Sequence, residues 1–262
     1  MDPVAFNVGG LAIYWYGILT AAGFGAGLWT ASRRVAGHPV LPRSVVADLG
    51  PWLIVGGLVG ARLWFVISYW NDDFAGKPLW EIFNVRGGGL VFYGGLVGAA
   101  IAGGLFARLQ RLPLWELADV LAPSIALGHA FGRVGCYTNG CCYGAPTRLP
   151  WGVPLPDAPI GQAVLVHPTQ LYEAILLLGL CAALAWHYHR KRFAGHTFAL
   201  YLIAYAILRF TLEFFRGDYG TPSLAGLKPG QAFSLVTLAA GVWLFLSQRA
   251  STPADTRAPP PG

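Results

Sequence analysis

Apolar residues along the chain gather into seven long runs, and glycine rather than charge interrupts most of them. A helix that crosses a bilayer core of about 30 Å needs about 20 mostly apolar residues, a length that the runs approach or exceed. The pattern therefore predicts an all-α, polytopic membrane protein with about seven transmembrane helices. The expected spans lie near residues 11–31, 47–67, 89–109, 114–135, 169–189, 197–216 and 231–247.

Composition excludes the other broad classes of protein. Hydrophobic residues make up 55% of the 262 residues and charged residues only 11%, whereas a soluble domain carries about 25% charged residues. The four cysteines are too few for a small disulfide scaffold. We expect a single membrane-embedded domain at residues 1–248, with its first helix retained because no basic signal-peptide start is present. The Pro-rich residues 249–262 are expected to form a disordered cytoplasmic tail.

The 18 basic residues predict the orientation of these helices. Ten lie in alternate connections and in the tail: Arg33, Arg34, Arg43, Arg108, Arg111, Arg190, Lys191, Arg192, Arg249 and Arg257. Five lie on the opposite side: Lys77, Arg86, Arg148, Arg216 and Lys228. The positive-inside rule then predicts an N-terminus outside and a C-terminus in the cytoplasm. The remaining three, Arg62, Arg133 and Arg209, lie inside or at the edge of predicted spans.

Charges at membrane depth are the first candidates for function. A charge at the centre of a helix costs about 2.5–3.5 kcal/mol on insertion scales, so such residues usually face a cavity or a partner. Glu213 follows Arg209 by four residues, the helical spacing that brings side chains together, and Arg216 extends the same stripe. This pair either only holds its helix in place or belongs to a binding site.

Arg133 has no acidic neighbour on its own helix, where the residue one turn earlier is His129. A guanidinium offers a rigid fork of donors that matches two phosphate oxygens. An unpaired arginine at this depth therefore indicates a phospholipid headgroup, and a side chain that snorkels to the interface is the alternative. Arg62 is expected to snorkel.

Three thiols stand together in GRVGCYTNGCCYG, just outside the fourth predicted span. Cys136, Cys141 and Cys142 could form a disulfide, a metal site or a thiol-exchange site. Their C-x₄-C-C spacing differs from standard zinc motifs, and a disulfide between Cys136 and one of the other two is the structural alternative. Cys181 is interpreted as facing lipid or as core packing in the fifth helix. His167 begins HPTQLYEA, which can also be read as a polar first turn of that helix.

Five motifs together resemble the prolipoprotein diacylglyceryl transferase family. They are WYG at 15–17, FYGGLVG at 92–98, GRVGCYTNGCCYG, HPTQLYE at 167–173 and RFTLEFFRGD at 209–218. The resemblance implies a multi-pass enzyme of the bacterial cytoplasmic (inner) membrane that needs no metal or other cofactor. It would transfer the diacylglyceryl group of phosphatidylglycerol to the lipobox cysteine of a pre-lipoprotein signal peptide, forming a thioether and releasing glycerol phosphate. Membrane lipids are expected partners, and nucleic acid is not.

The resemblance also assigns roles to individual residues. It implies that Arg133 contacts the phosphatidylglycerol headgroup and that Arg209 and Glu213 belong to the catalytic machinery. The same resemblance places substrate-binding positions along the chain, at Tyr16, Cys136, Asn139, Cys141 and His167, to which we add Arg216.

Three positions depart from the family pattern. Tyr93 stands where the family has a histidine, Cys136 where it has an asparagine, and Cys141 where it has a glutamate. In one hypothesis His129, or Tyr93 itself, accepts the proton of the incoming thiol. In the other, the chain is a divergent, non-catalytic paralogue, a lipid-binding membrane protein whose outer cysteines have redox or metal chemistry.

Overall fold

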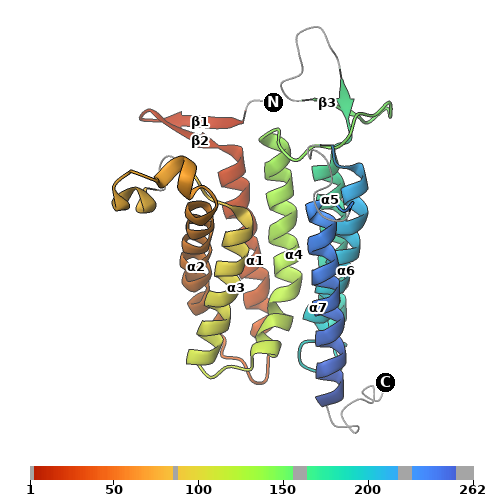
Figure 1. Cartoon of the computed structure of the whole chain (residues 1–262). Coiled ribbons are helices and arrows are strands. Elements are labelled where there is room, and N and C mark those ends of the chain that lie inside the picture. Colours follow the sequence, from red (N-terminus) through yellow and green to blue (C-terminus); the bar gives the residue numbers. More distant parts are fainter. Residues whose placement is uncertain (1–2, 85–87, 156–163, 218–225, 252–262) are drawn as a thin grey trace. The chain divides into compact units, whose positions relative to one another are not determined.

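The computed structural model describes residues 3–84, 88–155, 164–217 and 226–251. These residues form seven α-helices (Figure 1): α1 (Trp15–Val35), α2 (Val45–Ser68), α3 (Phe92–Leu109), α4 (Leu114–Thr138), α5 (Thr169–Tyr188), α6 (His196–Leu212) and α7 (Pro229–Ser251). The short elements are β1 (Val4–Val8), β2 (Leu11–Tyr14), the π-helical turn η1 (Trp70–Phe74), the 3₁₀ turns η2 (Leu79–Phe83) and η3 (Glu213–Phe215), β3 (Val153–Pro154) and β4 (Leu165–Val166). The predicted all-α fold is confirmed, with little sheet.

Five of the described helices are long and apolar enough to cross a membrane: α2, α3, α5, α6 with η3, and α7. The chain is therefore a multi-pass membrane protein. α1 and α4 have 21 and 25 residues, but they carry more polar character. α4 in particular contains Glu116, Asp119 and Arg133.

Several helix boundaries differ from the predicted ones, and three of these differences matter for the site or the tail. Residues 11–14 form strand β2, which pairs with β1 through a turn at Gly9 and Gly10, whose φ angles are +56° and +84°. Two glycines with positive φ favour a tight hairpin over the start of a helix. α4 continues to Thr138, so Cys136 lies in its last turn and not outside it. α7 continues to Ser251, and the rest of the predicted tail lies outside the described residues.

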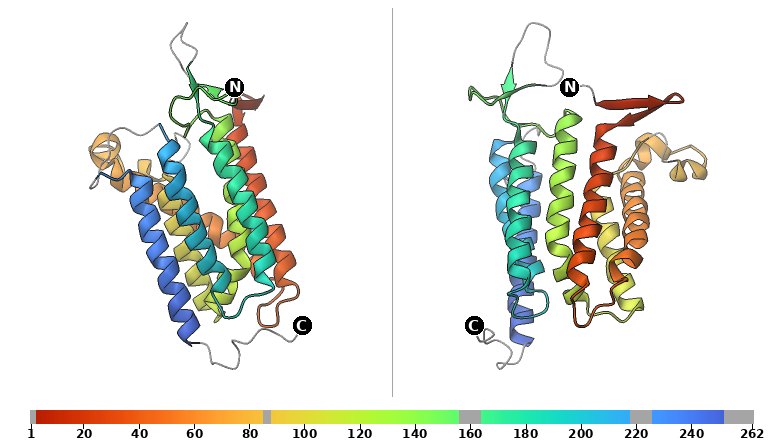
Figure 2. Two further views of the ribbon diagram at one scale, coloured as in Figure 1. Left: turned by 90° about the vertical axis from the view of Figure 1, so that its right-hand side faces the viewer. Right: turned by 180° about the vertical axis from the view of Figure 1, so that it is seen from behind.

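The fold divides into two compact units, and the first comprises the described residues of Met1–Ala31 and Ala118–Gly262. Its core lies where α4, α5 and α6 meet, around Ala122, Ala126, Leu184 and Tyr201. Asp119 of α4 is fully buried and accepts hydrogen bonds from the backbone N–H groups of Gly195 and Phe198, both at 2.9 Å. It thereby satisfies donors at the start of α6. Both views in Figure 2 show α5, α6 and α7 running side by side.

A short extended segment ties the ends of three elements in this unit together. Gly144 donates its N–H to the carbonyl of His167 at 2.9 Å, and Ala145 donates to the carbonyl of Phe215 at 2.8 Å. A Cβ at Gly144 would lie 2.5 Å from the Cβ of His167, so only glycine permits this approach. The loop after α4, the start of α5 and the end of η3 are therefore held together.

The second unit, Ser32–Leu117, is built on close packing between α2 and α3. A Cβ at Gly60 would lie 2.3 Å from the carbonyl oxygen of Gly94, which shows how near the two backbones come. Helices in lipid gain little from burying apolar surface against each other, so close van der Waals packing between small residues favours their association instead. The sequence predicts that Arg62 snorkels, but its guanidinium is bound by backbone carbonyls, including those of Glu81 and Ile82, both at 2.7 Å.

Candidate active site

Glu173 is the centre of a buried charge network in the first unit. It lies in α5 and is only 3% exposed. Its Oε2 is 3.0 Å from Nε of Arg133 on α4 and 3.7 Å from Nη1 of Arg209 on α6. Its Oε1 is 3.7 Å from Nε2 of His129. Three helices therefore bring two guanidinium groups and an imidazole to one carboxylate.

The prediction that Arg133 is unpaired is wrong. The argument from spacing considered only neighbours on the same helix, whereas the partner, Glu173, comes from another helix. Sequence reasoning interpreted Glu173 as part of a polar first turn and missed its role. The available signal was that Glu173 and Arg133 lie in separate predicted spans and that neither has an oppositely charged residue one turn away.

The predicted pair on α6 is confirmed. Nη2 of Arg209 lies 2.8 Å from Oε2 of Glu213, and both side chains are buried. Because Arg209 contacts Glu173 as well, the pair belongs to the larger network and is not isolated. A Cβ at Gly230 would lie 2.5 Å from Oε2 of Glu213, so the first turn of α7 packs directly on this carboxylate.

Two further basic residues surround the Glu213 end of the network. Lys228 donates from Nζ to the carbonyl oxygens of Glu213 at 2.9 Å and Arg216 at 2.7 Å, which satisfies acceptors at the end of η3. Arg216 is buried. Together with Arg133 and Arg209, these residues place four basic groups in the region of the two carboxylates of Glu173 and Glu213, which is an excess of positive charge.

Polar atoms of this network are incompletely satisfied within the part of the chain that the structure describes. Both carboxylate oxygens of Glu213, Oε1 of Glu173 and Nη1 of Arg209 are buried and make no hydrogen bond of good geometry there. The same is true of Nε of Arg133 and Oε1 of Gln170, although Arg133 is within ion-pair distance of Glu173. Buried polar groups normally find partners. The arrangement is therefore suited to receive a polar group.

The three thiols adjoin this network. All four cysteines are among the described residues, and none forms a disulfide in this structure. Hydrogen bonds from the Cys136 and Cys141 thiols, together with the charges of Arg216 and Arg133, lower the pKa of the Cys142 thiol. Cys181 packs at the core cluster of α4, α5 and α6, which is one of its two expected environments.

The remaining predicted site residues are distributed around this region. Tyr16 is 40% exposed, and its ring would lie 3.1 Å from a Cβ at Gly135, in the last turns of α4. Asn139 is exposed in the turn after α4, and its side chain lies close enough to the Cys141 thiol to act on it. Nδ1 of His167 is 3.3 Å from the hydroxyl of Tyr172. These three residues therefore lie near the thiols and the extended segment, with no ion pair to the arginines among the described residues.

Tyr93 belongs to the second unit. It lies in the first turn of α3 and is 38% exposed. Its predicted part in proton transfer stays a prediction.

Comparison with known proteins identifies the family. A family model described as prolipoprotein diacylglyceryl transferase matches residues 3–247. The relative from Nitratidesulfovibrio vulgaris is 38% identical over 255 residues, covering 95% of this chain and 94% of its own. Relatives from Gloeobacter violaceus and Bordetella bronchiseptica are 36% and 38% identical, over 95% and 94% of this chain and 94% and 95% of theirs. All three are named phosphatidylglycerol–prolipoprotein diacylglyceryl transferase. The chain belongs to the prolipoprotein diacylglyceryl transferase family.

Proposed function

We propose that this chain transfers the diacylglyceryl group of phosphatidylglycerol to the lipobox cysteine thiol of a pre-lipoprotein. A carbon–sulfur bond forms, the carbon–oxygen bond to the phosphate breaks, and glycerol phosphate leaves. The observation that carries this proposal is the buried network of Arg133, Glu173, Arg209 and Glu213, in a chain whose relatives are named for this reaction.

The excess of positive charge suits the leaving group. A phosphodiester carries one negative charge, and the phosphate gains a second as glycerol phosphate departs. Cations fixed in a low-dielectric site stabilise such developing charge strongly. We assign Arg133 and Arg209 to the phosphate, because their guanidinium groups meet at Glu173 and can each offer a fork of donors. Glu213 orients Arg209, and Arg216 adds positive charge at the same end.

His129 is the candidate proton acceptor for the incoming thiol. It stands one turn from Arg133, and its Nε2 is 3.7 Å from Oε1 of Glu173, so a small approach of the two groups would let the carboxylate orient the imidazole. We expect His129→Ala to slow transfer by about 100-fold. His189→Ala, which alters an exposed histidine at the end of α5, is the matched control. Full activity of His129→Ala would remove His129 from this role and leave Tyr93 as the alternative.

The proposal includes a membrane topology and a set of residues that line the substrate region. Seven spans, α1 to α7, would cross the bacterial cytoplasmic membrane with the N-terminus outside, and the lipobox cysteine and the phospholipid would both arrive through the bilayer. Tyr16, Asn139, His167, Cys136 and Cys141 would line the substrate region. Reporter fusions after Gly37 and after Ser251 should both be cytoplasmic, and an external reporter at either position would contradict this topology.

Complementation tests the function directly. Cells depleted of their own transferase should regain thioether-modified lipoprotein when they express this chain, and Arg133→Ala should abolish the rescue. Absence of rescue, with the protein present in the membrane in normal amount, would contradict the transferase activity and favour a lipid-binding role.

A further inference from the structure

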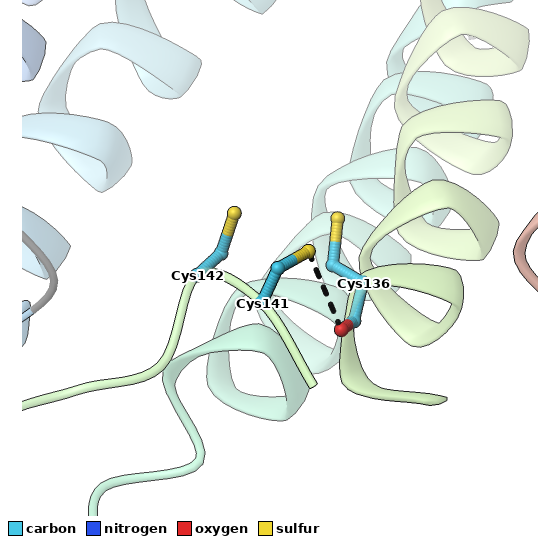
Figure 3. Close-up of side chains that lie close together, drawn as sticks. All are labelled: Cys136, Cys141 and Cys142. Atoms are coloured by element: carbon cyan, nitrogen blue, oxygen red, sulfur yellow. Dashed lines mark hydrogen bonds between the residues drawn. The ribbon is translucent and has the colours of Figure 1, made fainter. Parts of the chain in front are cut away.

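Three thiols converge where α4 ends. The Sγ atoms of Cys136, Cys141 and Cys142 all lie within 4.8 Å of one another, and Figure 3 shows the three side chains next to one another at the turn. Cys136 comes from the last turn of α4, and the other two come from the loop that follows. Each residue is half-buried. The transfer reaction forms no bond to any of these sulfur atoms.

The backbone holds the thiols together independently of any bond between them. Cys142 has a φ of +65°, in the left-handed region that residues other than glycine rarely adopt. Cys141 donates its N–H to the carbonyl of Cys136 at 3.1 Å. From the first turn of α5, Gln170 donates to the carbonyl of Cys141 at 2.7 Å and Thr169 donates to that of Cys142 at 3.0 Å. The cluster is therefore positioned by the surrounding structure.

The donor set suits a soft cation. Thiolates select soft metal ions, and a Zn–S bond of about 2.3 Å places three sulfurs around one ion roughly 4 Å apart. The observed spacing needs only a small adjustment to reach this arrangement. A disulfide would join two of the sulfurs and leave the third unused, whereas a metal ion uses all three.

The surrounding charge is also suitable. Three thiolates around a divalent cation retain one negative charge. Arg216 and Arg133 are close enough for their charges to act on Cys142, and an opposite charge nearby favours such an anionic complex.

We propose that Cys136, Cys141 and Cys142 form a three-thiolate site for one soft d¹⁰ cation of the class of Zn²⁺ and Cd²⁺. Binding releases the thiol protons to solvent as the sulfurs coordinate the ion. Standard zinc motifs add a second pair of ligands to the first pair of cysteines. The C-x₄-C-C run has no such second pair, and the convergence of its three thiols becomes visible only in the folded loop. This inference does not rest on the transferase activity.

Cadmium binding to the full-length, reduced chain in detergent micelles tests the site. We expect one Cd²⁺ per chain, with an ultraviolet thiolate-to-cadmium charge-transfer band. Cadmium should protect three of the four cysteines from alkylation, a readout that needs no variant. Cys136→Ser and Cys142→Ser should each lose the band and weaken binding by at least about 100-fold.

Cys181→Ser is the matched control, because Cys181 packs at the core of α4, α5 and α6 and should not change binding. Unchanged cadmium binding in Cys136→Ser and Cys142→Ser would overturn the proposal. So would a reduced wild-type chain that takes up no cadmium.

Discussion

Arg62 and Arg133 show two ways of accommodating an arginine in a predicted membrane span. In the second unit, Arg62 donates to four backbone carbonyls, those of Glu81, Ile82, Gly88 and Gly89, at 2.7–3.2 Å. In the first unit, Arg133 and Arg209 instead face the carboxylate of Glu173. The guanidinium of Arg62 is therefore held by neutral backbone acceptors, whereas the guanidinium groups of Arg133 and Arg209 share one charged carboxylate.

The difference separates a structural arginine from a candidate catalytic one. The donors of Arg62 are used within its own unit, where they anchor the segment after α2. Around Arg133 and Arg209, several buried polar atoms among the described residues lack a hydrogen bond of good geometry, and basic groups outnumber acidic ones. Such a region can accept an anion, because a phosphate supplies acceptors to Nε of Arg133 and Nη1 of Arg209, the two buried donors among these atoms.

The largest expected effect follows from removing the shared carboxylate. Glu173→Gln leaves Arg133 and Arg209 without their common counter-charge, and breaking a buried ion pair costs about 3–5 kcal/mol. We expect the transfer rate, measured with phosphatidylglycerol vesicles and a lipobox peptide, to fall by about 1000-fold. Asp72→Asn, at an exposed position in η1, is the control and should transfer normally. A Glu173→Gln variant within about threefold of wild type would show that the network is only structural.

Paired lysine substitutions test the comparison itself. Lysine keeps the charge but loses the planar fork. Arg133→Lys should therefore transfer about 100-fold more slowly with little change in melting temperature. Arg62→Lys should lose about 2 kcal/mol of stability, from hydrogen bonds to carbonyls, and keep its rate. If the two variants exchanged these effects, the division between structural and catalytic arginines would be wrong.

These contrasts also show what the sequence could predict. The helices follow from apolar runs of about 20 residues, and most predicted spans agree with the observed helices within a few residues. The Arg209–Glu213 pair was predictable because both residues lie on one helix at a fixed spacing. By contrast, the β1–β2 hairpin replaced the start of the first predicted span because Gly9 and Gly10 permit a tight turn.

Contacts between helices were beyond prediction from spacing. The pairing of Arg133 with Glu173 depends on how α4 and α5 pack, and the acceptors of Arg62 are backbone carbonyls of a loop. Backbone carbonyls are present at every residue, so no residue type marks them in advance. The thiol cluster was predictable in part. The three cysteines stood out in the sequence, but their convergence depends on a turn in which Gly140 and Cys142 both have positive φ angles.

A smaller effect is expected at the helix contact that organises the second unit. A Cβ at Gly60 would lie 2.3 Å from the Gly94 carbonyl oxygen. By contrast, the nearest atom to a Cβ at Gly57 would be 3.7 Å away, which is an ordinary van der Waals contact. Gly60→Ala should therefore cost about 2 kcal/mol of stability through overpacking. Gly57→Ala should be neutral or slightly stabilising, because alanine favours helix. Equal melting temperatures for the two variants would argue against the close packing of α2 and α3.

The smallest expected effect tests whether the position of Glu213 matters in the first unit. A Cβ at Gly230 would lie 2.5 Å from Oε2 and 2.8 Å from Oε1 of Glu213, so Gly230→Ala must displace the carboxylate that contacts Arg209. A displacement of this kind changes the geometry but not the charge, and we expect transfer to slow by about tenfold. Gly179→Ala is the matched control, because nothing lies within 4 Å of the added Cβ. If Gly230→Ala folds normally and transfers at the wild-type rate, Glu213 supplies charge to the network but does not position Arg209.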